Sequence, residues 1–268
     1  MNEAKQAVRE FWNQAACGEN LYLADTEMAS YAAQAQTRYA LEPYIRDFAR
    51  FEETRGLRVL EIGVGLGADH QQFAEAGADL WGIDLTERAI EHTRRRLSVF
   101  GLTSHLAMGD AEHLDFPDES FDRVYAWGVL HHSPDTPRAI AEVWRVLKHG
   151  GEARIMIYHK HSVVGFMLWL RYGLLVGRPW RSWADLYAHH LESPGTKAYT
   201  IAEARQLCAY FAQCHITTVL THGDLLTSAA GQRHRGPLLT VARKLWPRWL
   251  IRRFFPGNGL FMLIAAVK

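Results

Sequence analysis

Length, composition and charge are those of an ordinary globular protein: the chain has 268 residues, 48% of them hydrophobic, and a formal net charge of +1. That length can bury a full core and leave residues for a substrate cap, while the near-neutral charge gives no electrostatic case for nucleic-acid binding. The three cysteines, Cys17, Cys208 and Cys214, form no even framework and no metal-like spacing, which suits a reducing cytoplasm.

The start and the longest apolar run of the chain give no sign of secretion or membrane insertion. Residues 1–5 lead into a polar segment rather than a signal peptide. Residues 163–176 are apolar, but Gly165, Arg171 and Gly173 interrupt them and they are too short to span a bilayer. We therefore expect a cytoplasmic protein.

Residues 1–55 predict helices that precede the first buried strand. They are rich in rings, at Phe11, Trp12, Tyr22, Tyr31, Tyr39 and Tyr44. Ordinary packing accounts for most of these rings. Their number also favours a helical N-terminal lid over a ligand site in the domain that follows, residues 56–268.

The most informative segment is a strand followed by a glycine turn. Residues 59–62 predict a buried strand, Gly63, Gly65 and Gly67 a tight turn, and residues 68–73 the start of a helix. Glycines at such a corner let the backbone take positive φ and let a ligand lie against the main chain. This arrangement holds nucleotide-like ligands at the carboxyl end of a parallel sheet.

Glu61 lies inside this apolar strand, where an unpaired carboxylate is costly to bury. Backbone amides of the glycine turn, or the amino group of a ligand, would pair with it. The alternative is a carboxylate that ties down the loop without touching the ligand.

A second strand, residues 79–84, ends in Asp84, 17 positions after Gly67. This is close to the interval of about 20 residues at which a carboxylate meets ribose hydroxyls in such sheets. Thr86 is the better N-cap for the next helix, which leaves Asp84 free for the ligand.

The remaining core elements continue the alternation. Asp110 follows a third strand, residues 104–108, and is placed to accept a hydrogen bond from an exocyclic amine such as that of adenine. A fourth strand at 123–127, a helix at about 134–147 with a glycine C-cap, and a fifth strand at 152–158 come next. Five alternations predict an open, doubly wound α/β sheet.

Five ordered segments carry the most specific pattern: Leu60-Glu61-Ile62-Gly63-Val64-Gly65-Leu66-Gly67, Gly82-Ile83-Asp84-Leu85-Thr86, Gly109-Asp110-Ala111, Ser120-Phe121-Asp122 with Gly128-Val129-Leu130-His131-His132, and Arg145-Val146-Leu147-Lys148-His149-Gly150-Gly151. Together they resemble the motifs of class I S-adenosylmethionine (SAM)-dependent methyltransferases of the small-molecule type. The resemblance covers roughly residues 38–160. It implies SAM as cofactor and a seven-stranded sheet ending in an antiparallel hairpin, to which residues 216–220 and 260–267 fit.

The resemblance also implies a contact with SAM for individual residues. It places Gly63 and Gly65 at the methionine part, Asp84 at the ribose, Leu85 on adenine, Asp110 with Ala111 at the adenine amine, and carbonyls near Trp127 at the methionine ammonium. Glu61 and Gly67 complete the predicted cofactor site. Arg38 or Tyr31 is a candidate for the methionine carboxylate, with a solvated helix face as the alternative.

Two insertions lie outside the core. Residues 160–200, rich in Trp, Tyr and Phe, leave strand five at the ligand edge and are expected to wall the crevice. Residues 225–258 contain seven cations and no acid, interleaved with large apolar side chains. We expect both to form a substrate cap. For residues 225–258 a peripheral contact with an anionic membrane is the alternative, which salt-dependent vesicle binding distinguishes.

Methyl transfer from a sulfonium requires a nucleophile held ~3–3.5 Å from the methyl carbon, and a base only where the acceptor carries a proton at neutral pH. Histidine suits that role. His159, after strand five, is the first candidate and His132, after strand four, the second. His159 and His161 are not expected to bind a metal, because no acid or cysteine accompanies them.

The sequence therefore predicts methyl transfer to a small aromatic or hydrophobic metabolite, with O-, N- and C-acceptors left open. Alternatives are a non-catalytic SAM-binding partner or regulatory subunit, and a lipid or quinone methyltransferase at the membrane surface. A nicotinamide oxidoreductase is disfavoured by the Gly-x-Gly-x-Gly spacing and by Asp110. Nucleic-acid methylation is disfavoured because no Asn-Pro-Pro-Tyr-type base-flipping motif is present.

Overall fold

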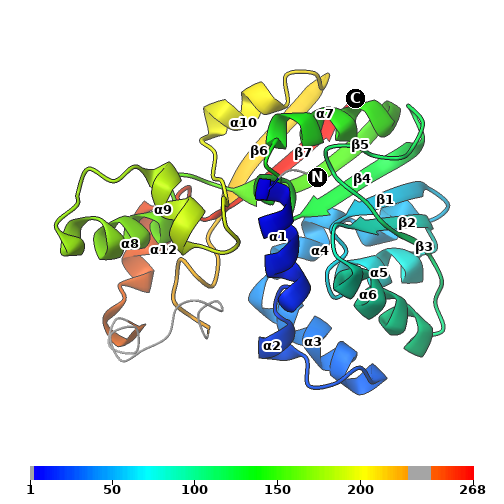
Figure 1. Cartoon of the computed structure of the whole chain (residues 1–268), viewed down its shortest axis with the longest axis horizontal. Helices are drawn as coiled ribbons and strands as arrows, with labels where there is room; N and C mark the ends of the chain where they lie inside the picture. Colours follow the sequence, from blue (N-terminus) through cyan, green and yellow to red (C-terminus); the bar gives the residue numbers. More distant parts are fainter. Residues whose placement is uncertain (1–2, 229–242) are drawn as a thin grey trace.

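The computed structural model describes residues 3–228 and 243–268. Within them, seven strands form one sheet in the order β3-β2-β1-β4-β5-β7-β6 (Figure 1). The strands are β1 (Arg58–Ile62), β2 (Asp79–Asp84), β3 (His105–Met108), β4 (Phe121–Trp127), β5 (Leu147–Tyr158), β6 (Gln213–Val219) and β7 (Phe261–Val267). The first five pair in parallel, and β7 runs antiparallel to both β5 and β6. The predicted doubly wound fold with its terminal hairpin is confirmed.

Helices pack on both faces of this sheet. The core helices are α5 (Ala68–Ala76), α6 (Glu87–Val99), α7 (Thr136–Val146) and α10 (Ile201–Leu207), with the short turn η2 (Leu130–His132) before α7. The central strands β1, β4 and β5 are buried because helices cover them. Their sequences are accordingly the near-continuous apolar runs expected of a parallel sheet covered on both faces.

The N-terminal segment is helical, as the sequence predicts. It comprises α1 (Glu3–Gln14), α2 (Glu19–Tyr22), α3 (Met28–Leu41), α4 (Tyr44–Ala49) and η1 (Phe51–Thr54). The first insertion forms α8 (Val163–Tyr172), η3 (Leu174–Val176) and α9 (Trp183–His190), and the second contains α12 (Arg248–Phe254). Figure 1 shows α8, α9 and α12 projecting together beyond the sheet; we call these elements with η3 the side lobe.

The predicted glycine C-cap after α7 is wrong. The helix ends at Val146, and Leu147 already has extended backbone angles and pairs with Phe121 of β4. Gly150, with φ of 76°, and Gly151 therefore lie within β5. At Gly151 a side chain would meet the Asp122 carbonyl at 3.0 Å, so close packing of β4 on β5 explains that glycine.

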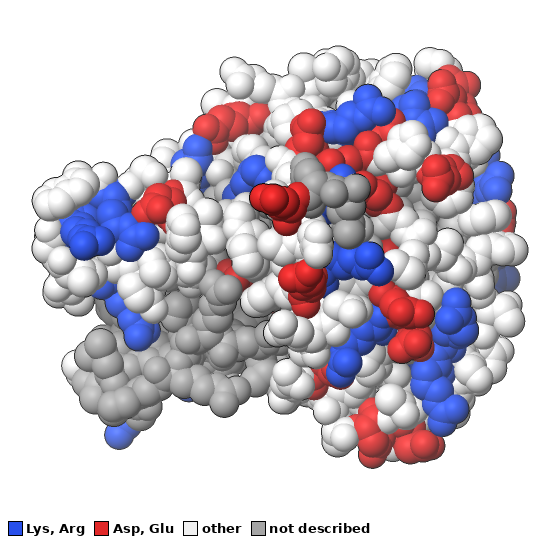
Figure 2. Space-filling model, in the orientation of Figure 1, with Lys and Arg blue, Asp and Glu red and all other residues white. Residues whose placement is uncertain are grey.

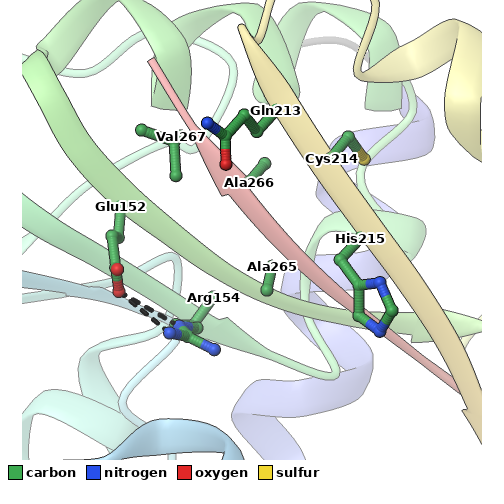
Figure 3. A pocket seen from close by; sticks show the side chains of 8 residues that line it. All are labelled: Glu152, Arg154, Gln213, Cys214, His215, Ala265, Ala266 and Val267. Atoms are coloured by element: carbon green, nitrogen blue, oxygen red, sulfur yellow. Dashed lines mark hydrogen bonds and ion pairs between the residues drawn. The ribbon is translucent and has the colours of Figure 1, made fainter.

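Charge and shape of the described surface away from the strand ends differ from those expected of the ligand site. On the face in Figure 2, acidic and basic side chains are interspersed over the body of the molecule. A hollow of about 340 Å³ lies on β5, β6 and β7, where Glu152 pairs with Arg154 (Figure 3). Its β5 residues, Glu152 and Arg154, lie at the middle of that strand and away from the carboxyl ends at which such sheets bind ligands.

No helix in the described part of the chain has both the length and the apolar character that crossing a membrane requires. Part of the predicted cationic segment, including Arg233 and Arg235, lies outside the described residues.

Candidate active site

The glycine corner between β1 and α5 needs its three glycines for different reasons. All have positive φ: 81° at Gly63, 53° at Gly65 and 74° at Gly67. A Cβ at Gly63 would lie 2.1 Å from Val129, and one at Gly67 would lie 2.9 Å from Thr93. A Cβ at Gly65 would meet nothing within 4 Å. Internal packing thus explains Gly63 and Gly67, whereas Gly65 marks the side of the corner left open for a ligand.

Asp84 lies at the carboxyl end of β2, beside this corner. Its Oδ1 accepts hydrogen bonds from Thr86 N at 2.9 Å and Thr86 Oγ1 at 2.8 Å, and its Oδ2 faces Gly65 N at 3.3 Å. Thr86 is the N-cap of α6, as predicted. The prediction that Asp84 is left free is wrong, because its carboxylate ties the glycine turn to the start of α6. Its Oδ2, with one long hydrogen bond, retains capacity to accept ribose hydroxyls. Leu85, next in the chain, is half-buried.

Glu61 pairs with a side chain of α5 rather than with the backbone amides of the glycine turn. Its Oε2 lies 2.8 Å from Nδ1 of His70, whose Nε2 lies 2.6 Å from Oγ of Ser104. Burial raises the pKa of the Glu61 carboxyl and lowers the pKa of His70 to about 3. Burial thus disfavours the charged form of both partners, and their contact lets Glu61 fix the glycine corner and α5 from inside the sheet.

The third anchor follows β3. Asp110 Oδ1 accepts a hydrogen bond from Glu112 N at 3.0 Å, and Lys5 Nζ lies 2.5 Å from both Asp110 Oδ2 and Glu112 Oε2. Ala111 lies between these two acids in the chain. Lys5 belongs to α1, so the first helix is fastened onto the residues expected to hold adenine. The sequence pattern gave no signal for this long-range pair.

Asp69, in the first turn of α5, joins the corner to the N-terminal helices. Its buried carboxylate accepts from Arg38 Nη2 at 2.6 Å, Tyr125 OH at 2.8 Å and Tyr39 OH at 3.0 Å. Burial opposes its charge, but Arg38 and the two hydroxyls outweigh burial and hold the pKa of Asp69 below its ordinary value. Arg38, a candidate for the cofactor carboxylate, is thus engaged within the protein.

Tyr31, the other candidate for the cofactor carboxylate, lies elsewhere. Its side chain is fully buried, and its hydroxyl contacts His92 of α6 at 3.1 Å from Nδ1. The prediction for Tyr31 is therefore not supported by its position.

A cluster of rings follows the end of β4. Trp127 lies 6.1 Å from Tyr44 and 5.8 Å from Phe261, and Tyr158 stacks on Phe261 at 5.8 Å between centroids. We call these four side chains the aromatic group. β4 is the neighbour of β1 in the sheet, so the group lies beside the strand that leads into the glycine corner.

Glu42 is a carboxylate next to this aromatic group that sequence reasoning missed. It is 9% exposed, its Oε2 accepts no hydrogen bond, and Arg38 Nη1 lies 3.6 Å from that atom. Burial raises the pKa of Glu42 to about 7. An acid just before Pro43 at a helix end is the only local signal in the sequence.

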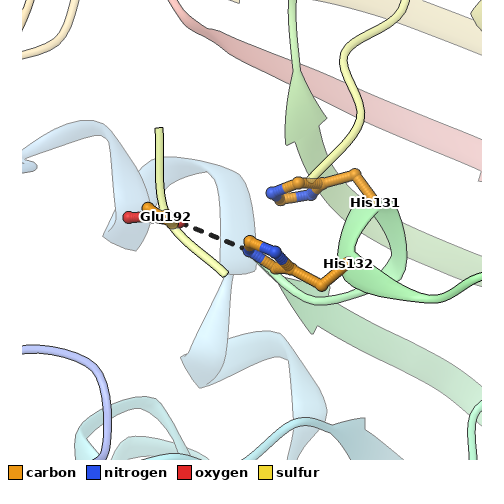
Figure 4. A group of neighbouring side chains, drawn as sticks. All are labelled: His131, His132 and Glu192. Carbon is orange, nitrogen blue, oxygen red and sulfur yellow. Dashed lines mark ion pairs between the residues drawn. The ribbon is translucent and has the colours of Figure 1, made fainter. Parts of the chain in front are cut away.

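Glu192 of the first insertion reaches the same region (Figure 4). Its Oε2 accepts a hydrogen bond from Tyr158 OH at 2.6 Å and lies 3.3 Å from His132 Nε2. His132 Nδ1 contacts Ser193 Oγ at 2.8 Å and Thr196 Oγ1 at 3.1 Å. The contacts of Nδ1 orient the His132 ring so that Nε2, which has no hydrogen-bond partner, faces Glu192, and the insertion supplies all three of these neighbours.

Among the described residues, His131, His132 and Glu192 have ligand atoms within 4.8 Å of one another, close enough to hold a metal ion. The Glu192 oxygen that faces His132 already accepts from Tyr158, whereas Nε2 of His132 and both ring nitrogens of His131 are buried without a hydrogen-bond partner in the structure. His131 is fully buried against the Tyr158 ring, 3.9 Å between centroids, and burial lowers its pKa. The sequence-based expectation of no metal stays a prediction.

His159, the first choice as base, lies at the root of the side lobe. It is 5% exposed, its Nδ1 is 3.3 Å from the Gly259 carbonyl, and burial lowers its pKa. His161 is exposed and packs beside Trp183. The structure gives His132, not His159, the carboxylate partner that a relay requires. Both remain candidates.

The sheet, the open glycine corner and the acids at the ends of β2 and β3 define a nucleotide-binding protein with the class I methyltransferase architecture. Residues 60–155 match a family model described as methyltransferase domain. This central part of the chain is therefore similar to a methyltransferase domain, and the residues around Gly65, Asp84 and Asp110 fit SAM.

Curated relatives share this central part. A phosphatidylethanolamine N-methyltransferase of Cereibacter sphaeroides is 36% identical over 113 residues, 41% of this chain and 55% of that protein. A sterol 24-C-methyltransferase of Aspergillus fumigatus is 33% identical over 41% of this chain and 32% of that protein. A ubiquinone/menaquinone C-methyltransferase of Bordetella avium is 36% identical over 39% and 42%. The chain thus spans about a third to just over half of the length of these relatives.

Solved structures share the fold over more of the chain. A SAM-dependent methyltransferase from Mesorhizobium loti superposes with a TM-score of 0.55 at 17% identity, covering 84% of this chain and 97% of that one. An N-methyltransferase from Haemonchus contortus, in complex with phosphomonomethylethanolamine and S-adenosylhomocysteine, has a TM-score of 0.59 at 17% identity and covers 97% and 60%. At these identities the likeness establishes the fold.

The geometry of the glycine corner predicts that one glycine substitution mainly lowers stability and another mainly lowers SAM affinity. Gly63→Ala should mainly destabilise the fold, by a few kcal/mol, because its Cβ overlaps Val129. Gly65→Ala should cost about 1–2 kcal/mol of stability from positive φ and should mainly weaken SAM binding. Urea unfolding and calorimetric titration separate the two effects. Full SAM affinity in a folded Gly65→Ala protein would contradict a ligand at the open side.

The raised pKa of Glu42 predicts that Glu42→Gln increases the free energy of unfolding relative to wild type as the pH rises. Its folded pKa of about 7 lies above its ordinary value of 4.5, so the stability it contributes is present below pH 4.5 and is lost as pH rises through 7. The variant should therefore gain about 3 kcal/mol relative to wild type between pH 5 and pH 8. Urea midpoints measure this gain. The exposed Glu53→Gln is the control, and equal pH dependence of wild type and Glu42→Gln would exclude a raised pKa.

Proposed function

We propose that the chain transfers a methyl group from SAM to a small aromatic or hydrophobic acceptor by in-line displacement. The observation that carries the proposal is the meeting of three anchors at adjacent strand ends: the open corner at Gly65, the acid Asp84 and the acid Asp110. The aromatic group beside them offers an apolar surface to an acceptor, and the intact site argues against the alternative of a non-catalytic SAM-binding subunit.

In this proposal the residues position groups and exclude water. Asp84 accepts the ribose hydroxyls, Asp110 with Ala111 holds the adenine amine, Leu85 packs on adenine, and the main chain at Gly65 and Trp127 takes the methionine part. Bound SAM supplies the electrophilic methyl group on its sulfonium. The aromatic group holds the acceptor, since alignment and exclusion of water provide most of the rate enhancement in such a displacement.

A proton must leave the acceptor when its nucleophilic atom is a hydroxyl or an ammonium group. His132 is held by Ser193 and Thr196 on one side and faces Glu192 on the other. Proton uptake by His132 would place an imidazolium beside the Glu192 carboxylate, which stabilises it. We therefore prefer His132 over His159 as the base, and Glu192 and Tyr158 as its positioning residues.

The acceptor class rests on composition and on relatives. The Cereibacter, Aspergillus and Bordetella relatives are named for a phospholipid, a sterol and quinones, all apolar molecules. A lipid or quinone acceptor is therefore the second candidate beside a soluble aromatic metabolite. Incubation of the protein with methyl-labelled SAM and separate aqueous and organic extracts of the source organism tests both. A labelled product identifies the acceptor, and absence of product in both extracts would favour the non-catalytic alternative.

The cofactor assignment predicts that Asp84→Ala weakens SAM binding. Each lost charge-assisted hydrogen bond to the ribose should cost about 1.5–3 kcal/mol. Asp79→Ala is the matched control, because Asp79 begins the same strand at its other end. Calorimetric titration measures both variants. Unchanged affinity in Asp84→Ala, or equal losses in the two variants, would remove Asp84 from the site.

The choice of base predicts a difference between two histidine variants. With a protonated acceptor, turnover should fall at acid pH, because an imidazole base that has taken up a proton can no longer accept one from the acceptor. His132→Gln should abolish this acid limb of the pH profile and Glu192→Gln should lower turnover, both with SAM binding intact. His159→Gln should leave the limb in place. If only His159→Gln removes the limb, the base is His159; burial of that residue would place the limb below pH 6.5.

A further inference from the structure

Large apolar side chains are exposed mainly on one part of the molecule. Thirteen are exposed among the described residues, and ten of these fall within two segments, 166–180 and 245–255, five in each. Leu245 is 78% exposed, Trp180 77%, Leu175 70% and Trp249 69%. Such a concentration is unusual, since soluble proteins rarely expose large contiguous apolar patches without an interaction partner.

The two segments belong to the same lobe although 64 residues, 181–244, separate them in sequence. Val163 N, at the start of α8, donates to the Asn258 carbonyl at 2.8 Å, and Asn258 Nδ2 donates to the His161 carbonyl at 2.9 Å. The turn after α12 is thus bonded to the start of α8, and Figure 1 shows both helices in the side lobe. We call residues 166–180 and 245–255 the apolar tip.

The cap predicted for residues 225–258 would bury the aromatic side chains of α12. In the structure Ile251 is the buried residue of α12, whereas Trp249, Phe254 and Phe255 are exposed. The described part of that segment therefore directs much of its apolar surface outward.

The two chain segments that form the apolar tip carry cations and no acid. Residues 163–184 contain three cations and residues 243–258 contain five, and neither range contains Asp or Glu. The exposed ones are Arg171, Arg178, Lys244, Arg252 and Arg253. Figure 2 shows basic side chains on this lobe with an acidic one beside them, and Asp185 of α9 pairs with Arg181 at 2.6 Å.

We propose that the apolar tip docks on the surface of an anionic phospholipid bilayer. Trp, Phe and Leu side chains next to Arg and Lys match the interfacial zone, where rings enter the headgroup boundary and cations contact lipid phosphates. A second copy fits less well, because pairing two tips would bring cations against cations. The first segment of the tip follows the carboxyl end of β5, at the edge of the sheet where the proposed active site lies. Docking of the tip would therefore hold this edge beside the bilayer.

Co-sedimentation with vesicles tests the proposal. The full chain is mixed with vesicles of phosphatidylcholine alone or with added phosphatidylglycerol, at low and high salt. Binding is expected with the anionic vesicles and should weaken strongly at high salt, because screening shortens the reach of the cations to a few Å near 1 M. Absence of binding to anionic vesicles at low salt would overturn the proposal.

Substitutions in the apolar tip test whether any vesicle binding depends on this surface. The double variant Trp180→Glu, Trp249→Glu and the double variant Arg252→Ser, Arg253→Ser should each reduce vesicle binding about tenfold, the effect of losing about 1.4 kcal/mol. Tyr210→Glu is the control, because Tyr210 is 66% exposed but lies outside the tip. Loss of binding in the control as well, or retention in both double variants, would contradict docking by the tip.

Two further measurements keep the outcomes distinct. Calorimetric SAM binding by the variants shows that they are folded, and a chain that binds vesicles but not SAM overturns the proposed function alone. Analytical ultracentrifugation without lipid detects self-association. A wild-type dimer that Trp180→Glu, Trp249→Glu dissociates, together with no vesicle binding, would assign the tip to a second copy instead.

Discussion

The buried carboxylate of Asp69 is the interaction on which the arrangement of the site depends. It accepts hydrogen bonds from Arg38 and Tyr39 of α3 and from Tyr125 of β4, immediately after the glycine corner. A buried charge that loses its partner costs several kcal/mol. The N-terminal helices, the central sheet and the corner therefore cannot move apart independently, and the main-chain geometry at Gly65 is set by contacts with distant parts of the chain.

The N-terminal helices are also fastened at two other places. Arg96 of α6 is fully buried and donates to Gln34, to the Leu66 carbonyl and to Gln71. Lys5 of α1 pairs with Asp110 and Glu112 at the third anchor. These contacts differ in burial: the Arg96 group is sealed inside, while Asp110 is about a third exposed. We infer that, of these N-terminal helices, α1 yields when a cofactor enters and α3 stays in place.

Local patterns in the sequence predicted the elements that depend on neighbouring residues. The strand ending at Asp84, the Thr86 cap and the glycine corner were found because their periodicity and spacing are encoded within a few positions. Partners brought together by folding were missed. His70 for Glu61, Lys5 for Asp110, and Glu192 for His132 come from other elements, and no short-range signal marks them. The glycine pair at 150–151 was misassigned for the same reason, since its role depends on packing against β4.

Hydrogen–deuterium exchange with and without SAM is the measurement that tests the central claim most directly. The account predicts that SAM slows exchange at three separated stretches together, the corner at 63–69, the turn at 84–86 and the third anchor at 109–112, and that it changes exchange in α1. Residues at the hollow on β5, β6 and β7 should not respond. Protection confined to one of the three stretches, or protection only outside them, would contradict a single cofactor site at these strand ends.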